Sequence, residues 1–128
     1  MVTFDKDIAV VYLLDDDPSI LKATSRLLDS HGWNVETFTD PISFLNHVEM
    51  HCPAVAVIDM VMPEMNGLEV QKRLRRISPS TRVIVLTARD DLSVRRMAMN
   101  AGASAFFIKG IEKDKFLAGV RAAADGEN

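Results

Sequence analysis

The chain alternates short runs of apolar residues with longer segments in which apolar residues recur every three or four positions. Four of the short runs are continuous and rich in β-branched or aromatic residues, which is typical of strands buried on both faces of a sheet. The run at residues 35–38 alternates apolar with polar residues and predicts an edge strand. Strands are therefore expected at residues 8–14, 35–38, 54–58, 83–86 and 105–108.

The periodic segments predict five helices, one after each strand. Asp17 and Asp40 are each followed by proline, a pair typical of an N-cap and the first helical position. Glycine is a common residue just after a helix, because it adopts the left-handed conformation without strain. Gly32 is expected to end the first helix, and the third helix is expected over residues 67–77. Asp90 or Asp91 is expected to cap the fourth helix, which Gly102 ends, and the fifth helix is expected to end near residue 124.

Each predicted helix has an apolar face that should pack against the sheet. These inward faces are expected to consist of Ile20, Ala23, Leu27 and Leu28 in the first helix, Ile42, Leu45 and Val48 in the second, Val70, Leu74 and Ile77 in the third, and Phe116, Leu117, Val120 and Ala124 in the fifth.

Strands that alternate with helical crossovers indicate an α/β fold with a parallel sheet and helices on both faces. For five such units we expect a doubly wound (βα)5 arrangement with strand order 2-1-3-4-5. This order places the first and third strands side by side, and ligands of such sheets bind beyond the carboxyl ends of the strands. The functional site is therefore expected at that edge.

Length and composition favour one compact domain over residues 1–128, with residues 125–128 as a tail or the start of a linker. The formal net charge of -3 gives no reason to expect nucleic-acid binding by the chain as a whole. Cys52 is the single cysteine, so no internal disulfide can form, which suits a reducing cytoplasm. No apolar run is long enough to span a bilayer, and we expect a cytoplasmic protein without a membrane partner.

Five residues with reactive or charged side chains follow or end the predicted strands: Asp15, Asp16, Asp59, Thr87 and Lys109. Three carboxylates in one cleft repel one another unless a cation lies between them. Oxygen ligands without histidine or cysteine indicate Mg²⁺, or the similar Mn²⁺. Carboxylate, divalent cation, ammonium and hydroxyl together are what in-line phosphoryl transfer requires, with Asp59 as a nucleophile that forms an acyl phosphate.

Four motifs in order carry a resemblance that extends over the whole chain. They are residues 10–18 (VVYLLDDDP), 59–67 (DMVMPEMNG), 85–88 (VLTA) and 106–109 (FFIK). The chain resembles the receiver domain of response regulators in two-component signalling, which has a CheY-like, flavodoxin-like fold. The resemblance implies a phosphoacceptor domain with only self-phosphorylation and self-dephosphorylation chemistry, not an enzyme.

The resemblance implies that Asp59 accepts a phosphoryl group from a histidine kinase or a phosphotransfer protein. It also implies that Asp16 binds the metal directly, that Asp15 acts largely through water, and that the Val61 backbone carbonyl completes the protein ligands.

The resemblance further implies that Thr87, Lys109 and the Ala88 backbone N–H hold the phosphoryl oxygens. Phe106 occupies the position of the aromatic switch residue, which would respond to an inward movement of Thr87. Phosphorylation would then alter the face made by the fourth helix, the fifth strand and the fifth helix, which also suggests a homodimer. Receivers are often attached to DNA-binding output domains, and we expect any such domain to lie outside this chain. This face carries the cations Arg95, Arg96, Lys113 and Lys115, which are equally compatible with a solvated surface.

The chain departs from the family pattern at two positions. Gly110 stands where the family usually has a proline after the lysine, so we expect a trans peptide bond and a less certain reach for Lys109. Phe106 stands where tyrosine is frequent, and the missing hydroxyl predicts weaker discrimination between two states. Val61 and Arg89, two residues past the acceptor and past Thr87, offer no carboxylate or amide to orient an attacking water. A long-lived acyl phosphate is therefore expected.

Other functions compete with this interpretation. A degenerate receiver that acts as a phosphorylation-independent interaction module is the main alternative, because Gly110 breaks the pattern. A haloacid-dehalogenase-like phosphatase would have a second aspartate where Val61 stands, and a flavodoxin would have a hydroxyl-rich phosphate loop after the first strand. His47, His51 and Cys52 have spacing compatible with a metal site, although a solvated helix end is the more common arrangement.

Overall fold

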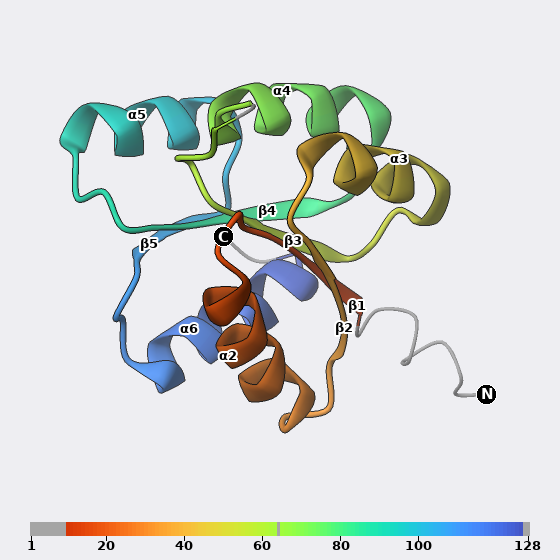
Figure 1. Cartoon of the computed structure of the whole chain (residues 1–128), viewed down its shortest axis with the longest axis vertical. Coiled ribbons are helices and arrows are strands. Elements are labelled where there is room, and N and C mark those ends of the chain that lie inside the picture. Colours follow the sequence, from red (N-terminus) through yellow and green to blue (C-terminus); the bar gives the residue numbers. More distant parts are fainter. Residues whose placement is uncertain (1–9, 64, 127–128) are drawn as a thin grey trace.

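The computed structural model describes residues 10–63 and 65–126. Five parallel strands form one sheet in the order β2-β1-β3-β4-β5, as the alternation of strands and helices predicted. Helices α3, α4 and α5 cover one face of the sheet and α2 and α6 cover the other (Figure 1). The strands are β1 (Val10–Leu14), β2 (Asn34–Phe38), β3 (Val55–Ile58), β4 (Arg82–Thr87) and β5 (Ala105–Ile108).

Aspartate caps begin three of the helices. The carboxylates of Asp17, Asp40 and Asp91 accept hydrogen bonds from the backbone N–H groups of residues 19, 43 and 93, at 2.9, 2.8 and 2.9 Å. Each bond satisfies a donor that the first helical turn leaves without an intrahelical partner. The helices are α2 (Pro18–Asp29), α3 (Pro41–His51), α4 (Gly67–Ile77), α5 (Leu92–Asn100) and α6 (Lys113–Ala124).

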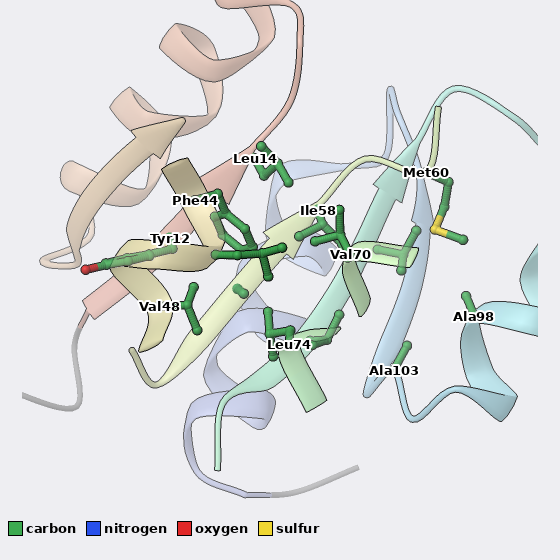
Figure 2. Close-up of a cluster of buried hydrophobic side chains, with 14 of the residues drawn as sticks. Tyr12, Leu14, Phe44, Val48, Ile58, Met60, Val70, Leu74, Ala98 and Ala103 are labelled. Carbon is green, nitrogen blue, oxygen red and sulfur yellow. The ribbon is translucent and has the colours of Figure 1, made fainter. Parts of the chain in front are cut away.

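The sheet separates two apolar layers, because successive side chains of a strand point to opposite faces. In β1, Tyr12 and Leu14 pack under α3, α4 and α5, whereas Val11 and Leu13 pack under α2 and α6. Figure 2 shows the first layer, where the Phe44 ring lies close to Tyr12 and Leu74 packs below Val70 and Ile58. A sheet covered on both faces explains why the strands are nearly continuous apolar runs.

Several sequence predictions differ from the structure in detail. In α2, Ala23 is exposed and Leu21 is buried, and the helix ends at Asp29. In α3, Ile42 is 49% exposed, whereas Phe44 is fully buried. Neighbouring apolar positions in each helix allowed two phases of the 3.6-residue repeat, and packing against the sheet selects between them. Two strand bounds differ slightly, since β3 begins at Val55 and β4 begins at Arg82. In α6, Ala123 is buried, while Leu117 and Ala124 are half-buried. Residues 8–9 of the first predicted strand lie outside the described residues.

Sheet hydrogen bonds continue past the ends of β3 and β5. The Asp59 N–H donates to the Leu14 carbonyl at 3.0 Å, and the Lys109 N–H donates to the Thr87 carbonyl at 2.8 Å. The backbone at these residues is therefore held by the neighbouring strand. This arrangement directs the side chains of Asp59 and Lys109 to the same edge of the sheet.

Gly67 is the point where α4 approaches the loop after β3 most closely. Its N–H donates to the Met60 carbonyl at 3.0 Å. A Cβ at this position would meet the Asp59 carbonyl oxygen and lie 2.6 Å from Met60 Cα. Both are backbone atoms, so glycine is required for the observed packing of α4 against this loop.

Gly119, in the middle of α6, also makes a close approach. A Cβ there would lie 2.6 Å from Cζ of Phe107 on β5. The glycine therefore accommodates an aromatic ring of this chain. Unlike the backbone beside Gly67, this ring can turn away about its own side-chain torsions.

We predict that Gly67→Ala lowers the free energy of unfolding by about 1–3 kcal/mol, because the added methyl group forces backbone to move. The matched variant is Gly119→Ala, where a helix-propensity gain of about 1 kcal/mol offsets the displacement of the Phe107 ring. Chemical denaturation measures both changes, and amide chemical shifts of residues 59–62 should move only in Gly67→Ala. Equal destabilisation by the two variants would contradict this account.

Candidate functional site

Three aspartates gather at the carboxyl edge of the sheet. Asp15 and Asp16 follow β1, and Asp59 follows β3, which is the neighbour of β1. One carboxylate oxygen from each lies within 4.8 Å of the others. Asp15 and Asp59 are each 4% exposed, whereas Asp16 is exposed to solvent. The edge is therefore an acidic pocket with two buried carboxylates and one at its mouth.

The Lys109 ammonium group, from the end of β5, lies between the two buried carboxylates. Its Nζ atom is 2.8 Å from Asp15 Oδ2 and 3.5 Å from Asp59 Oδ2. The Lys109 side chain is 19% exposed, so this contact is shielded from water more than a surface ion pair is. The lysine therefore supplies the positive charge that two close carboxylates need.

The environment shifts the pKa values of both Asp15 and Lys109 upward. Burial raises the pKa of the Asp15 carboxyl, and the Asp59 charge adds to the effect, although hydrogen bonds from Lys109 and the Asp17 N–H oppose it. Burial alone would lower the pKa of Lys109, but the hydrogen bond to Asp15 and the two negative charges outweigh it. The ammonium form of Lys109 is thus strongly favoured in this pocket.

The chemistry of the donor set fits a hard divalent cation. All three candidate ligands are carboxylate oxygens, which are the ligands that Mg²⁺ takes in proteins, and they lie within 4.8 Å of one another. An acidic triad of this kind is typical of the Mg²⁺ site of receiver domains.

Thr87 lies at the end of β4, next to β3, and is fully buried. The register pairs Ile58 with Val85, so Thr87 lies one residue beyond the level of Asp59. Its Oγ1 accepts a hydrogen bond from the Arg89 N–H at 3.4 Å. Ala88 is the next residue and is exposed, which leaves the loop backbone at the rim of the pocket.

Val61 lies two residues after Asp59, and its side chain is 49% exposed. Its N–H is 3.4 Å from Asp59 Oδ1, a long hydrogen bond that turns the loop around the carboxylate. The Arg89 guanidinium points to Asp91, with Nη2 3.2 Å from Oδ2, and its side chain is 58% exposed. Neither residue places a carboxylate or amide beside Asp59.

Phe106 lies on β5 and pairs with Val85 of β4, below the acidic edge. The ring is only 7% exposed and packs with Ala98 and Ala103 in the layer under α5. Arg95 of α5 covers it, with the guanidinium carbon 5.7 Å from the ring centroid. This cation–π contact lies beside the site, and the sequence alone does not predict it.

The departure at Gly110 has a clear structural consequence. The Lys109–Gly110 bond is trans, since no described peptide bond is cis, and Gly110 has a φ of +97°. This left-handed conformation favours glycine. Lys109 nevertheless reaches both buried carboxylates, so the replacement of proline leaves its reach intact.

Asp17 has a second role that sequence reasoning missed. It was predicted as an N-cap, and its side chain does cap α2. Its backbone N–H also donates to Asp15 Oδ1 at 3.0 Å. The sequence gives only a weak signal for this bond, namely an aspartate followed two residues later by a helix cap.

Among the residues that the structure describes, no helix is both long and apolar enough to cross a lipid bilayer.

Known proteins share both the sequence and the fold of this chain. The chain is 36% identical over 115 residues to the response regulator protein TodT of Pseudomonas putida, a match that covers 90% of this chain and 51% of TodT. The chain thus spans about half the length of this relative.

Two solved receiver domains superpose well on the chain. The response regulator receiver domain protein (CheY-like) from Methanospirillum hungatei gives a TM-score of 0.86 at 26% identity, covering 91% of this chain and 94% of that one. The BeF3-activated DrrB receiver domain gives a TM-score of 0.82 at 29% identity, covering 91% and 97%. The doubly wound sheet is therefore the CheY-like fold.

The family itself is established by sequence over most of the chain. Residues 11–121 match the response regulator receiver domain family, a range that includes every residue of the acidic pocket and Lys109. The chain therefore belongs to the response regulator receiver domain family, and it is a phosphoacceptor-type signalling domain of two-component systems with an acidic pocket formed by Asp15, Asp16 and Asp59.

Proposed function

We propose that this receiver accepts a phosphoryl group on Asp59, with Mg²⁺ or Mn²⁺ bound in the acidic pocket. One observation carries the proposal: three carboxylates from two loops lie within 4.8 Å of one another, and the Lys109 ammonium lies against two of them. A pocket built only for stability has no need to bury two adjacent carboxylates.

The metal ligands would be the carboxylates of Asp16 and Asp59 and the Val61 backbone carbonyl, with Asp15 acting largely through water. When bound, the ion would neutralise the crowded carboxylates and the charge that develops on the phosphoryl oxygens. The oxygen-only donor set and its spacing support this assignment.

Asp59 is the group that would react. One of its oxygens attacks the phosphorus of a phosphohistidine, an O–P bond forms, and the N–P bond breaks. The imidazole nitrogen leaves with the bonding electron pair and takes up a proton. Asp59 is fixed for this step because its backbone N–H is held by Leu14 and its carboxylate lies beside Lys109.

Thr87, Lys109 and the Ala88 N–H would bind the phosphoryl oxygens. Lys109 already lies 3.5 Å from Asp59 Oδ2, so a phosphoryl group on that carboxylate would lie within reach of its ammonium. Thr87 is buried at the end of the neighbouring strand, and among the described residues its hydroxyl takes part in one hydrogen bond, the long one from the Arg89 N–H. A weak existing bond leaves the hydroxyl free to turn toward a new acceptor.

Phe106 would transmit this event to the face made by α5, β5 and α6. A movement of Thr87 toward the phosphoryl group changes the space beside β5, where Phe106 is packed. The change is a shift between two existing populations, limited by the difference in their contacts. We infer that this face binds an output partner, a second copy of the chain, or a DNA-binding output domain outside this chain.

A receiver domain implies a cognate histidine kinase, directly or through a phosphotransfer protein. The DrrB receiver domain, which superposes on this chain, is a BeF3-activated form, and this supports an activatable receiver here. A cytoplasmic location, suggested by the single Cys52, remains part of the proposal.

We predict that incubation with acetyl phosphate and Mg²⁺ adds one phosphoryl group to the chain, because a small phosphodonor needs only the pocket itself. Intact mass spectrometry measures the gain. Asp59→Asn should abolish it, and removal of the divalent cation by a chelator should suppress it in the wild type.

Asp90→Asn is the matched control, since Asp90 is an exposed carboxylate on the neighbouring loop after β4. It should leave the mass gain unchanged. Failure of the wild-type chain to gain mass under these conditions would instead support a phosphorylation-independent interaction module. Repeated turnover of a phosphomonoester would support a phosphatase.

We predict that the acyl phosphate on Asp59 is long-lived, because Val61 is apolar and the Arg89 guanidinium is paired with Asp91. Val61→Asn supplies an amide beside the acceptor and should shorten the phosphoryl half-life several-fold, since it can orient an attacking water. Phosphate release after removal of the donor gives the rate. Val61→Ala is the control and should stay near the wild-type rate, while rapid release by the unmodified chain would refute the prediction.

A further inference from the structure

The outer surface of α3 carries a group of soft and nitrogen ligands that the receiver function does not use. His47, Met50 and His51 occupy positions i, i+3 and i+4, which lie on one side of a helix. All three are exposed, and Met50 is 74% exposed, although methionine is usually a packing residue. Figure 1 shows α3 at one side of its helix layer, over the half of the sheet that ends in the edge strand β2.

The His47 ring is held by two contacts, one at Nδ1 and one at its face. Its Nδ1 lies 2.8 Å from the Ser43 carbonyl, which only accepts hydrogen bonds, so Nδ1 carries the proton in the neutral ring. The lone pair is then on Nε2. The ring also packs against Phe38, with the ring centroids 5.1 Å apart. A hydrogen bond from the second nitrogen to a carbonyl is the usual support of a metal-binding histidine.

His51 lies one helical turn further along. Its ring centroid is 6.2 Å from that of His47, and the two planes differ by 31°. His51 is in the last turn of α3, where the partial negative charge of the helix end favours a cation. The two imidazoles are thus close enough for one ion to join them after a small side-chain rotation.

The ligand types select the metal. Imidazole binds Zn²⁺, Ni²⁺ and copper, and a thioether favours Cu⁺, whereas Mg²⁺ takes oxygen ligands. Among divalent ions of the first transition row, Cu²⁺ binds such nitrogen ligands most tightly. The site differs in chemistry from the carboxylate pocket after β1 and β3, so the two ions would not compete for the same ligands.

We propose that α3 carries a copper site formed by His47 Nε2, a ring nitrogen of His51 and the Met50 thioether. The imidazoles bind the ion in both oxidation states, and the thioether contributes to Cu⁺. Cys52, next to His51, directs its Sγ toward the Glu49 carbonyl at 3.9 Å and is not required. This site is independent of phosphorylation.

The experiment uses tag-free chain carrying Cys52→Ser, to exclude thiol oxidation, with saturating Mg²⁺ to occupy the acidic pocket. Titration calorimetry with CuCl₂ should show one site. His47→Gln and His51→Gln should each weaken Cu²⁺ binding at least tenfold, because each removes one of two nitrogen ligands. Circular dichroism confirms that each variant is folded.

His31→Gln is the matched control, because His31 is the one histidine of the chain outside α3 and lies just after α2. It should leave the affinity within twofold. For Cu⁺, measured under anaerobic conditions by competition with a chromophoric chelator, Met50→Leu should weaken binding at least threefold, while Cu²⁺ binding stays unchanged.

Two results would overturn the proposal. Unchanged Cu²⁺ affinity in both His47→Gln and His51→Gln would place the ion elsewhere, and loss of the site in Asp16→Asn would place it in the acidic pocket. Equal Cu⁺ affinity of the wild type and Met50→Leu would refute the role of the thioether.

Discussion

The mutual repulsion of Asp15 and Asp59 is the constraint that shapes this domain. Two buried carboxylates at neighbouring strand ends repel each other, and a positive charge between them relieves that repulsion. The Lys109 ammonium supplies that charge from β5, at 2.8 and 3.5 Å. The raised pKa of Lys109 shows that this attraction exceeds the desolvation that opposes it. Removing one partner would leave an uncompensated buried charge, which is strongly destabilising.

The sheet topology makes this arrangement possible at a low entropic cost. Asp15, Asp59 and Lys109 are far apart along the chain, yet parallel strands bring their carboxyl ends to one edge. Hydrogen bonds from the Asp59 N–H to the Leu14 carbonyl and from the Lys109 N–H to the Thr87 carbonyl fix the loops where they leave the sheet. A divalent cation bound among the carboxylates would meet the same electrostatic need as the Lys109 ammonium. With such an ion bound, the Lys109 ammonium would be available to a further anion.

The sequence allowed the fold and the gathering of three aspartates at one edge to be predicted, but not the contacts inside the pocket. Strand order and the caps at Asp17 and Asp40 follow from local patterns, whereas the sequence left Asp90 and Asp91 as alternatives for the cap of α5 and the structure selects Asp91. These patterns depend on nearby residues and on the handedness of crossovers. The phase of α2 and α3 was wrong at Ala23 and Ile42, because two adjacent apolar stripes fit the helical period and only packing selects one.

Contacts between side chains of distant elements could not be predicted from the sequence, for a different reason. The Lys109 Nζ atom lies 2.8 Å from Asp15 Oδ2 and 3.5 Å from Asp59 Oδ2, and the sequence does not specify so small a difference between two distances. Gly119 is an example, since only the structure shows that Phe107 occupies the space beside it. Such contacts are set by packing at high density, which a one-dimensional pattern does not specify.

Phe106 illustrates how a missing group can be replaced by a neighbour. A tyrosine hydroxyl at this position would offer a hydrogen bond with a net contribution of about 0.5–1.5 kcal/mol. The Arg95 guanidinium over the Phe106 ring supplies a cation–π contact of about 0.5–1 kcal/mol at an exposed site. The two free energies are similar, so the contact with Arg95 contributes about as much stabilisation of the ring position as a hydroxyl hydrogen bond would. Because Arg95 belongs to α5, any movement of the ring must also break or remake a contact with that helix. If Phe106 responds to the state of the pocket, as we propose, Arg95 would carry that response to the surface of α5.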